Sequence, residues 1–333
     1  MDSLTQIVLG SSVAYAVSGD KIGKKALLLG AFFGTLPDLD FLFTAPFKDE
    51  FLYLKYHRGF SHSLLFCLLS SIFFSWCSRK LKLKISSNII FKVVFWSILT
   101  HIILDCFTSW GTQVFWPLSY RISLSSIFIV DPLYTTPLLL GVFCVFLIKN
   151  YRKCKRIIFI GLLISTTYLV GTFSIKLYMN DRFESLFERN NFEVKNYITR
   201  PGPFNSILWS AVVDTDLGYY YVISSLLDQS DTNQMYFISK NQEVPSSFLT
   251  KRTIDLISYT KNYYTIEPYD KGILVHDLRY GFLGDPFLNG ENFVFSYELV
   301  KNSEGVVTLS IKNPRPKNTR RLLSQAWTRL KGI

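Results

Sequence analysis

The chain has 333 residues, of which 49% are hydrophobic and 16% aromatic, and its net charge is +11. A mean hydropathy of +0.22 argues against a wholly soluble protein of this length. A basic chain is a candidate for nucleic-acid binding, but here many basic residues lie in short segments between apolar runs. That pattern is typical of cytoplasmic loops. We therefore expect an integral membrane protein that binds no nucleic acid.

Six apolar stretches occupy the first 180 residues, at 4–17, 26–36, 64–77, 89–106, 127–148 and 157–179. A straight helix needs about 20 residues to cross a hydrocarbon core of about 30 Å. The first three stretches are shorter than this, whereas the last two are long enough to span. The sequence therefore predicts an α-helical integral membrane domain over residues 1–180.

Basic segments set the expected orientation of this domain. Lysine and arginine gather at 21–25, 79–84 and 149–156, and such residues mark the cytoplasmic side of a membrane protein. If all three basic segments lie in the cytoplasm, consecutive apolar stretches can cross the membrane in alternating directions, and no basic segment falls on the outer side. We therefore expect a multi-pass protein whose C-terminal part, residues 181–333, is extracytoplasmic.

Residues 181–333 are more polar and predict a small β-rich or α+β extramembrane domain. Strand-forming residues fill 219–224, 293–300 and 305–311. The basic C-terminal tail, residues 312–331, has seven basic residues and no acidic one. Within it, Leu322–Leu330 is either an amphipathic helix on a membrane surface or a solvated tail.

Four clusters of ionisable residues lie at the outer ends of the apolar stretches. They contain Asp38 and Asp40, the run from His57 to Ser63, the pair His101 and Asp105, and Asp131 before Pro132. These residues play no part in orienting the stretches, yet that orientation brings six imidazoles and carboxylates to one membrane face, namely Asp38, Asp40, His57, His62, His101 and Asp105. Ionisable groups near hydrocarbon are costly and usually functional. We therefore expect a divalent-metal site there.

The spacing within these clusters suits metal ligation. His101 and Asp105 are four residues apart, so on a helix both side chains share one face, about 40° apart. His57 and His62 flank Gly59, so a loop can bring both rings to one point. Each pair can therefore supply two ligands to one metal.

Asp38 and Asp40 allow two arrangements. In an extended segment both carboxylates share a face and can reach one metal, whereas in a turn only one does and the other can orient a histidine. A spare carboxylate can also serve as a general base. Arg58 either contacts an anionic substrate or pairs with an aspartate. We assign catalytic roles to Asp40 and Arg58, and we expect the metal ligands Asp38, His57, His62, His101 and Asp105.

Imidazole and carboxylate ligands suit zinc, our first choice, and also manganese or iron. A metal with an open position lowers the pKa of its water and creates a nucleophile. Two other residues are set aside. Asp131 can simply begin a helix that has Pro132 at its first position, and His276 lies far away in the sequence.

Several motifs resemble those of the YdjM-like family of membrane-bound metal-dependent hydrolases, also called the LexA-binding, inner-membrane-associated hydrolase family. They are Met1–Gln6, Pro37–Asp40, His57–Ser63, and His101–Asp105 followed by Thr108–Gln113. The resemblance covers roughly residues 1–140. It implies a helical domain in the bacterial inner membrane and a hydrolase activity, without naming a substrate. Many members have a histidine at the position of Gln6, which leaves the ligand count open.

The leading hypothesis is a metal-dependent hydrolase at the outer membrane face. A lipid or lipid-linked ester or phosphoester is the expected substrate, because the site lies at head-group depth. The alternative is a non-enzymatic scaffold or regulatory protein with a structural metal or a polar cluster. A phosphohistidine lipid phosphatase is disfavoured because Phe95 and Trp96 stand where an arginine is expected. A transporter is disfavoured by the few spans. No protein partner is indicated.

Overall fold

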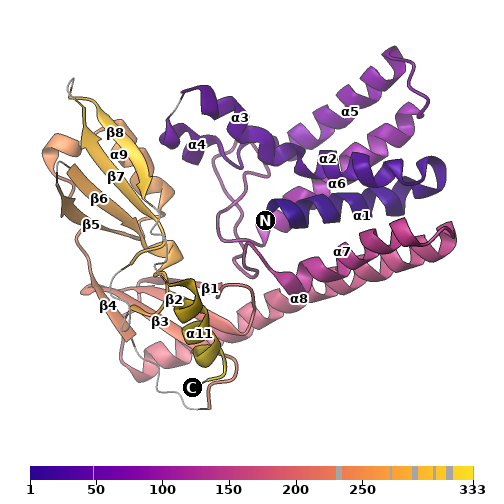
Figure 1. Cartoon of the computed structure of the whole chain (residues 1–333). Coiled ribbons are helices and arrows are strands. Elements are labelled where there is room, and N and C mark those ends of the chain that lie inside the picture. The colour runs from indigo at the N-terminus through magenta and orange to yellow at the C-terminus, as the bar shows by residue number, and fades with distance from the viewer. Residues whose placement is uncertain are drawn as a thin grey trace. The chain divides into compact units, whose positions relative to one another are not determined.

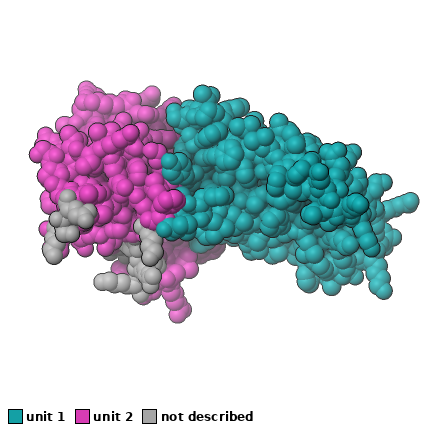
Figure 2. All heavy atoms as spheres, turned by 90° about the horizontal axis from the view of Figure 1, so that it is seen from above, with its two compact units in different colours: residues 1–46, 56–176, 203–206 teal, residues 47–55, 177–202, 207–333 magenta. Residues whose placement is uncertain are grey.

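The computed structural model describes residues 1–47, 49–229, 235–270, 272–286, 292–302, 305–312 and 318–332, so part of the expected basic tail lies outside it. The chain forms two compact units (Figure 2). Unit 1 comprises residues 1–46, 56–176 and 203–206, and unit 2 comprises 47–55, 177–202 and 207–333. The long helix α8 (Tyr151–Arg189) belongs to both units and runs through residue 180, the expected boundary.

Each apolar stretch of the sequence forms a helix. The main helices are α1 (Ser3–Ile22), α2 (Lys25–Thr35), α5 (Leu64–Lys80), α6 (Ser87–Cys106), α7 (Pro132–Leu147) and α8. Short helical segments connect α2 to α5: η1 (Leu36–Asp40), α3 (Phe41–Thr44), η2 (Ala45–Phe47), α4 (Glu50–Tyr56) and η3 (Phe60–His62) (Figure 1). The predicted helical membrane domain is thereby confirmed.

Among the residues that the structure describes, three helical segments are long and apolar enough to cross a membrane, namely Lys25–Phe47, Ser87–Cys106 and Tyr151–Arg189. A fourth results if Glu50–His62 and Leu64–Lys80 form one bent span. The first segment is longer than the predicted stretch, which ended at Pro37. Pro37 occupies the first turn of η1, where its missing N–H has no helical partner, so the chain remains helical beyond it.

Helix α7 is shorter than the predicted stretch 127–148. It has 16 residues, a rise of about 24 Å. The carboxylate of Asp131 accepts hydrogen bonds from the backbone N–H groups of Leu133 and Tyr134, and Pro132 follows at the first helical position. This cap begins the helix at Pro132 and leaves residues 127–130 outside it.

Glycines bring α1 and α2 into close contact. A Cβ atom on Gly10 would lie 2.2 Å from the carbonyl oxygen of Gly30, and one on Gly34 would lie 2.7 Å from that of Gln6. Small residues four apart allow membrane helices to approach this closely. The contact places Gln6 and the Gly34 carbonyl group beside the residues of the candidate site.

Helix α6 lies in the core of unit 1. Val94, Ile98 and Ile102 are fully buried and belong to a cluster that reaches α1, α2 and α5. His101 and Asp105 continue the same buried face, because they follow Val94 and Ile98 by seven residues each. The packing of α6 therefore carries both polar side chains into the interior of unit 1.

Unit 2 contains two four-stranded antiparallel sheets, each with its strands in sequence order. The first comprises β1 (Asn196–Pro201), β2 (Leu208–Asp214), β3 (Gly218–Ser225) and β4 (Met235–Ser239), and the second β5 (Tyr264–Tyr269), β6 (Gly272–Asp277), β7 (Ser296–Lys301) and β8 (Val307–Lys312). Helices α9 (Lys251–Tyr259) and α11 (Thr319–Leu330) accompany them. The predicted β-rich domain is confirmed, and the three predicted strands correspond to β3, β7 and β8.

The segment 47–55 belongs to unit 2 although its neighbours on both sides belong to unit 1. Asp49 pairs with Arg252 of α9 at 2.9 Å, and Lys55 pairs with Asp255 at 3.4 Å. These two ion pairs to α9 fix the segment 47–55 within unit 2.

Candidate metal centre

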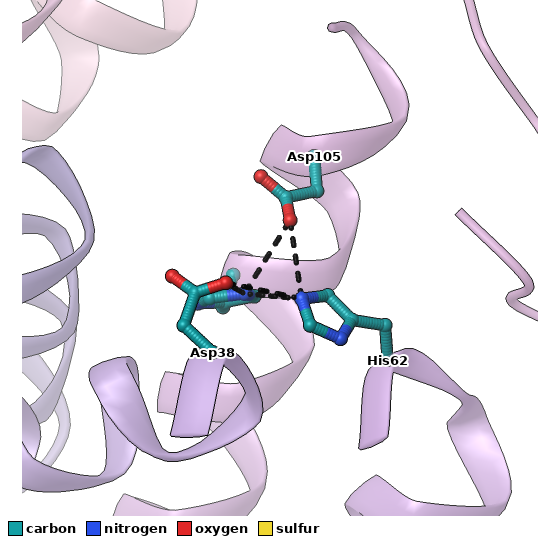
Figure 3. Close-up of side chains that lie close together, drawn as sticks. Asp38, His62 and Asp105 are labelled. Atoms are coloured by element: carbon teal, nitrogen blue, oxygen red, sulfur yellow. Dashed lines mark hydrogen bonds and ion pairs between the residues drawn. The ribbon is translucent and has the colours of Figure 1, made fainter. Parts of the chain in front are cut away.

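Four side chains of unit 1 converge on one point. Asp38 comes from η1, His62 from η3, and His101 and Asp105 from α6, and one potential ligand atom from each lies within 4.8 Å of the others. Figure 3 shows Asp38, His62 and Asp105 pointing toward one another. The side chains of His62, His101 and Asp105 are fully buried, whereas that of Asp38 is 18% exposed. Asp38 is therefore the most accessible of the four candidate ligands.

The separations between these atoms suit a metal. Nε2 of His62 lies 3.1 Å from Nε2 of His101, and 3.3 Å from both Asp38 Oδ1 and Asp105 Oδ2. Nε2 of His101 lies 3.6 and 3.5 Å from the same two oxygens. Four ligands of a tetrahedral zinc ion lie about 3.3 Å apart, given metal–ligand distances of about 2.0–2.1 Å. The observed separations match that spacing.

Hydrogen bonds on the far side of each ring assign the imidazole protons. Nδ1 of His101 lies 2.7 Å from the carbonyl oxygen of Gly34, which can only accept, so Nδ1 carries the proton. Nδ1 of His62 lies 2.9 Å from Ser61 Oγ, which donates to Asp40 at 3.2 Å. His62 Nδ1 therefore donates to Ser61. In the neutral form of each ring, the Nε2 lone pair then faces the centre, as metal ligation requires.

Asp105 supplies an oxygen atom without a hydrogen-bond donor. Its Oδ1 accepts from Gln6 Nε2 at 3.1 Å and contacts the backbone nitrogen of Met1. Its Oδ2 is buried and accepts no hydrogen bond from the described residues, although Arg58 Nε lies 3.1 Å away. Arg58 supplies positive charge beside this oxygen, and the oxygen lies 3.3 and 3.5 Å from Nε2 of His62 and His101. Because imidazole nitrogens and carboxylate oxygens gather at this point, the residues present fit a divalent metal.

The two aspartates of η1 point in different directions. Residues in a 3₁₀ helix are about 120° apart, so Asp38 and Asp40 cannot share one face. Of the two arrangements expected from the sequence, the turn is found. Asp38 faces the centre, while Asp40 lies 3.0 and 3.1 Å from Nδ1 of His57.

His57 lies outside the group of four. Its ring centroid is 5.9 Å from that of His62, and Trp110 packs edge-on against it at 5.5 Å. Asp40 also accepts the backbone N–H of Arg58 at 3.0 Å, which holds the loop around His57. The structure therefore brings four of the five expected ligands together and pairs His57 with Asp40 beside them.

Arg58 is buried and lies against Asp105, in one of its two expected roles. Its Nη1 donates to Thr108 Oγ1 at 2.6 Å, and its carbonyl oxygen accepts from Gln113 at 3.0 Å. Its backbone has φ of +56°, which is uncommon for a residue other than glycine. These contacts hold Arg58 in a sparsely populated conformation, a feature that clusters at functional sites.

Four contributors to the site were not assigned roles from the sequence: Ser61, Thr108, Trp110 and the carbonyl group of Gly34. The first three lie within the motifs that carry the family resemblance, which is the signal that marks them. Gly34 contributes its backbone carbonyl group, which every residue type has, so the sequence cannot indicate this role.

Two residues that the sequence analysis set aside lie apart from the centre. Asp131 caps α7 and accepts from Tyr168 at 2.8 Å. His276 lies in β6 of unit 2, with Nδ1 2.7 Å from Ser296 Oγ and Nε2 3.1 Å from Glu267. Both have structural partners that account for their burial.

The fold and the site define a helical membrane protein with a buried cluster of histidine and aspartate. The sequence profile of the YdjM inner membrane protein family matches residues 1–179, and the chain belongs to that family. The matched range contains every residue of the centre. Searches among curated proteins and among solved structures found no similar protein. The family and the apolar helices identify this chain as a membrane protein.

Proposed function

We propose that this protein is a metal-dependent hydrolase that cleaves an ester or phosphoester of a lipid or lipid-linked molecule at the outer face of the inner membrane. The observation that carries the proposal is the convergence of two imidazole lone pairs and two carboxylates in one buried centre. Zinc is the first choice, with manganese and iron as alternatives. When bound, the metal would polarise a water molecule and the oxygen of the scissile group.

Residues of this chain would bind the metal, transfer the proton and orient Asp105. Asp38, His62, His101 and Asp105 would hold the metal. Asp40 accepts the Nδ1 proton of His57 and so leaves Nε2 of that ring as the basic atom. The His57–Asp40 pair would then take a proton from the attacking water and return it to the leaving group. Arg58 would keep Asp105 ionised and oriented.

The placement at the outer face rests on the charge pattern. The basic segments 21–25, 79–84 and 149–156 support a cytoplasmic position for the opposite helix ends. The site residues occupy the ends of α2, α6 and their connections, which is where lipid head groups meet a membrane helix. A substrate with an apolar tail and an ester or phosphoester head suits that depth.

One observation favours a second candidate function. Four protein groups surround the centre, and structural zinc sites have four protein ligands, whereas catalytic sites usually have three and a water. The protein would then be a membrane scaffold or regulator stabilised by the metal.

Metal analysis combined with a substrate screen separates these candidates. The full chain, purified in mild detergent, would be analysed by inductively coupled plasma mass spectrometry and tested on lipid esters and phosphoesters. We expect near-stoichiometric metal and turnover that chelators abolish. Stoichiometric metal without turnover on any substrate would favour the structural role. No bound metal after repletion would contradict both candidates.

A further inference from the structure

The C-terminal helix α11 has an exposed apolar edge between basic residues. Leu323 and Trp327, one helical turn apart, are 52% and 60% exposed. At about 100° per residue, Arg320 lies about 20° and Lys331 about 40° from Trp327 around the helix. Nζ of Lys331 lies 5.3 Å from the centre of the Trp327 ring. The exposed edge therefore combines apolar side chains and positive charge.

The opposite side of α11 is attached to the first sheet. Arg329 forms an ion pair with Asp228 and donates to the carbonyl oxygen of Ile223 in β3 at 2.9 Å. Figure 1 shows α11 over the first sheet, where it contacts β3. Leu322 and Ala326, on the attached side, are partly buried. These contacts fix the rotation of the helix, so Leu323 and Trp327 face away from the sheet.

The same attachment brings α11 close to the end of the apolar stretch of α8. Arg182 of α8 lies 4.0 Å from Asp228 and donates to the carbonyl oxygen of Ser225 at 3.0 Å. Arg182 follows Met179, the last residue of the apolar stretch of α8, by three residues, a rise of about 4.5 Å. The attached end of α11 is therefore tied to α8 close to the end of the apolar stretch of that helix.

We propose that α11 is a membrane-surface anchor, with Leu323 and Trp327 inserted among the head groups of an anionic lipid leaflet. Tryptophan is enriched at membrane interfaces, and basic amphipathic helices lie in that plane. The described residues of α11 include no acidic one, so it complements anionic phosphates. Each basic residue near such a surface strengthens binding about fivefold. This inference does not depend on the metal centre.

Quenching of Trp327 by brominated lipid tests the proposal. The full chain would be placed in nanodiscs of brominated phosphatidylcholine, with or without phosphatidylglycerol. The Trp327 signal is the difference between the wild type and Trp327→Phe. We expect this signal to be quenched, and more strongly with phosphatidylglycerol. The proposal would be overturned if the Trp327 signal were not quenched, or if the quenching were the same with and without phosphatidylglycerol.

Two charge-reversal variants test which face of α11 meets the lipid. Arg320→Glu places an acid on the same face of the helix as Trp327, two turns away, and should lower the anionic-lipid effect severalfold. Arg321→Glu makes the same change about 120° away from Trp327 and should leave the effect unchanged. Hydrogen exchange of the β3 amides verifies that both variants remain folded. Equal effects of the two reversals would show a nonspecific charge response and contradict the proposed orientation.

Discussion

The Nε2 atoms of His62 and His101 face each other at 3.1 Å, while the carbonyl oxygen of Gly34 holds the proton of His101 on its other nitrogen. Ser61 does the same for His62. In their neutral forms, these tautomers place two Nε2 lone pairs opposite each other, and a bound metal ion would accept both. This geometry leads to the first prediction.

Replacing either histidine of the centre should remove the metal. Removing a residue that only hydrogen-bonds to a metal ligand lowers metal affinity by up to about 100-fold. His62→Ala and His101→Ala remove a ligand itself, so each should lower metal affinity by more than that. Inductively coupled plasma mass spectrometry of the purified variants measures this. His276→Ala is the matched control, because that histidine lies in β6 with partners of its own and should keep the metal. Full metal content in His101→Ala would contradict the assignment.

The two aspartates of η1 should separate metal binding from turnover. Asp40→Asn removes the carboxylate that orients His57, so we expect turnover to fall by about 10²–10⁴-fold while metal remains bound. Asp38→Asn makes the same chemical change two residues earlier and should lose the metal itself. Parallel assays of metal content and hydrolysis rate test both. Loss of metal in Asp40→Asn but not in Asp38→Asn would reverse the proposed roles.

Breaking the buried ion pair between Arg279 and Asp277 should destabilise unit 2. Arg279 donates to both carboxylate oxygens of Asp277, and its guanidinium lies 4.6 Å from the ring centre of Tyr259. Burial disfavours the charge, but Asp277 raises the pKa of Arg279 well above its usual value. Arg279→Met leaves Asp277 buried and unpaired, which should cost about 3–5 kcal/mol. Denaturation followed by near-ultraviolet circular dichroism measures the loss.

The control for that experiment is Lys195→Met, which breaks the exposed pair of Lys195 with Asp216. Solvent screens such a pair, so the unfolding midpoint should change little. Similar shifts in both variants would show that burial of the Arg279 pair has no special effect.

The attachment of α11 should weaken in acid. Burial opposes ionisation of Asp228, but the hydrogen bonds from Arg329 outweigh it and lower the pKa of Asp228 below its usual 3.8. A lowered folded-state pKa means that the contribution to stability is present above about pH 3.8 and is lost as the pH falls through the folded-state pKa. Exchange of the α11 amides should therefore be faster in Asp228→Asn than in the wild type at pH 7.

The difference between wild type and Asp228→Asn should shrink as the pH falls below 3.8, because the wild-type carboxyl group then becomes neutral too. Asp216→Asn, which changes an exposed carboxylate elsewhere in unit 2, should leave α11 exchange unchanged at pH 7. A constant difference at all pH values would contradict the role of the Asp228 charge.

Local periodicity made much of this protein predictable from its sequence. The apolar runs predict the helices because an apolar segment in lipid must satisfy its own backbone hydrogen bonds. The spacing of His101 and Asp105 predicts a shared helix face, which the structure has. The charge pattern of the loops predicts one membrane face for the four clusters. Three of these clusters meet in the structure, whereas Asp131 caps α7 apart from them. All of these predictions depend on neighbours only a few residues away.

The tertiary structure decided what depends on distant neighbours. Whether Asp38 and Asp40 share a face depended on the 3₁₀ turn of η1, which packing against η3 and α6 selects. The tautomer of His101 depends on a carbonyl group 67 residues away, and a backbone acceptor leaves no trace in residue type. The pairing of His57 with Asp40, rather than with the centre, likewise follows from where two separate turns meet in space.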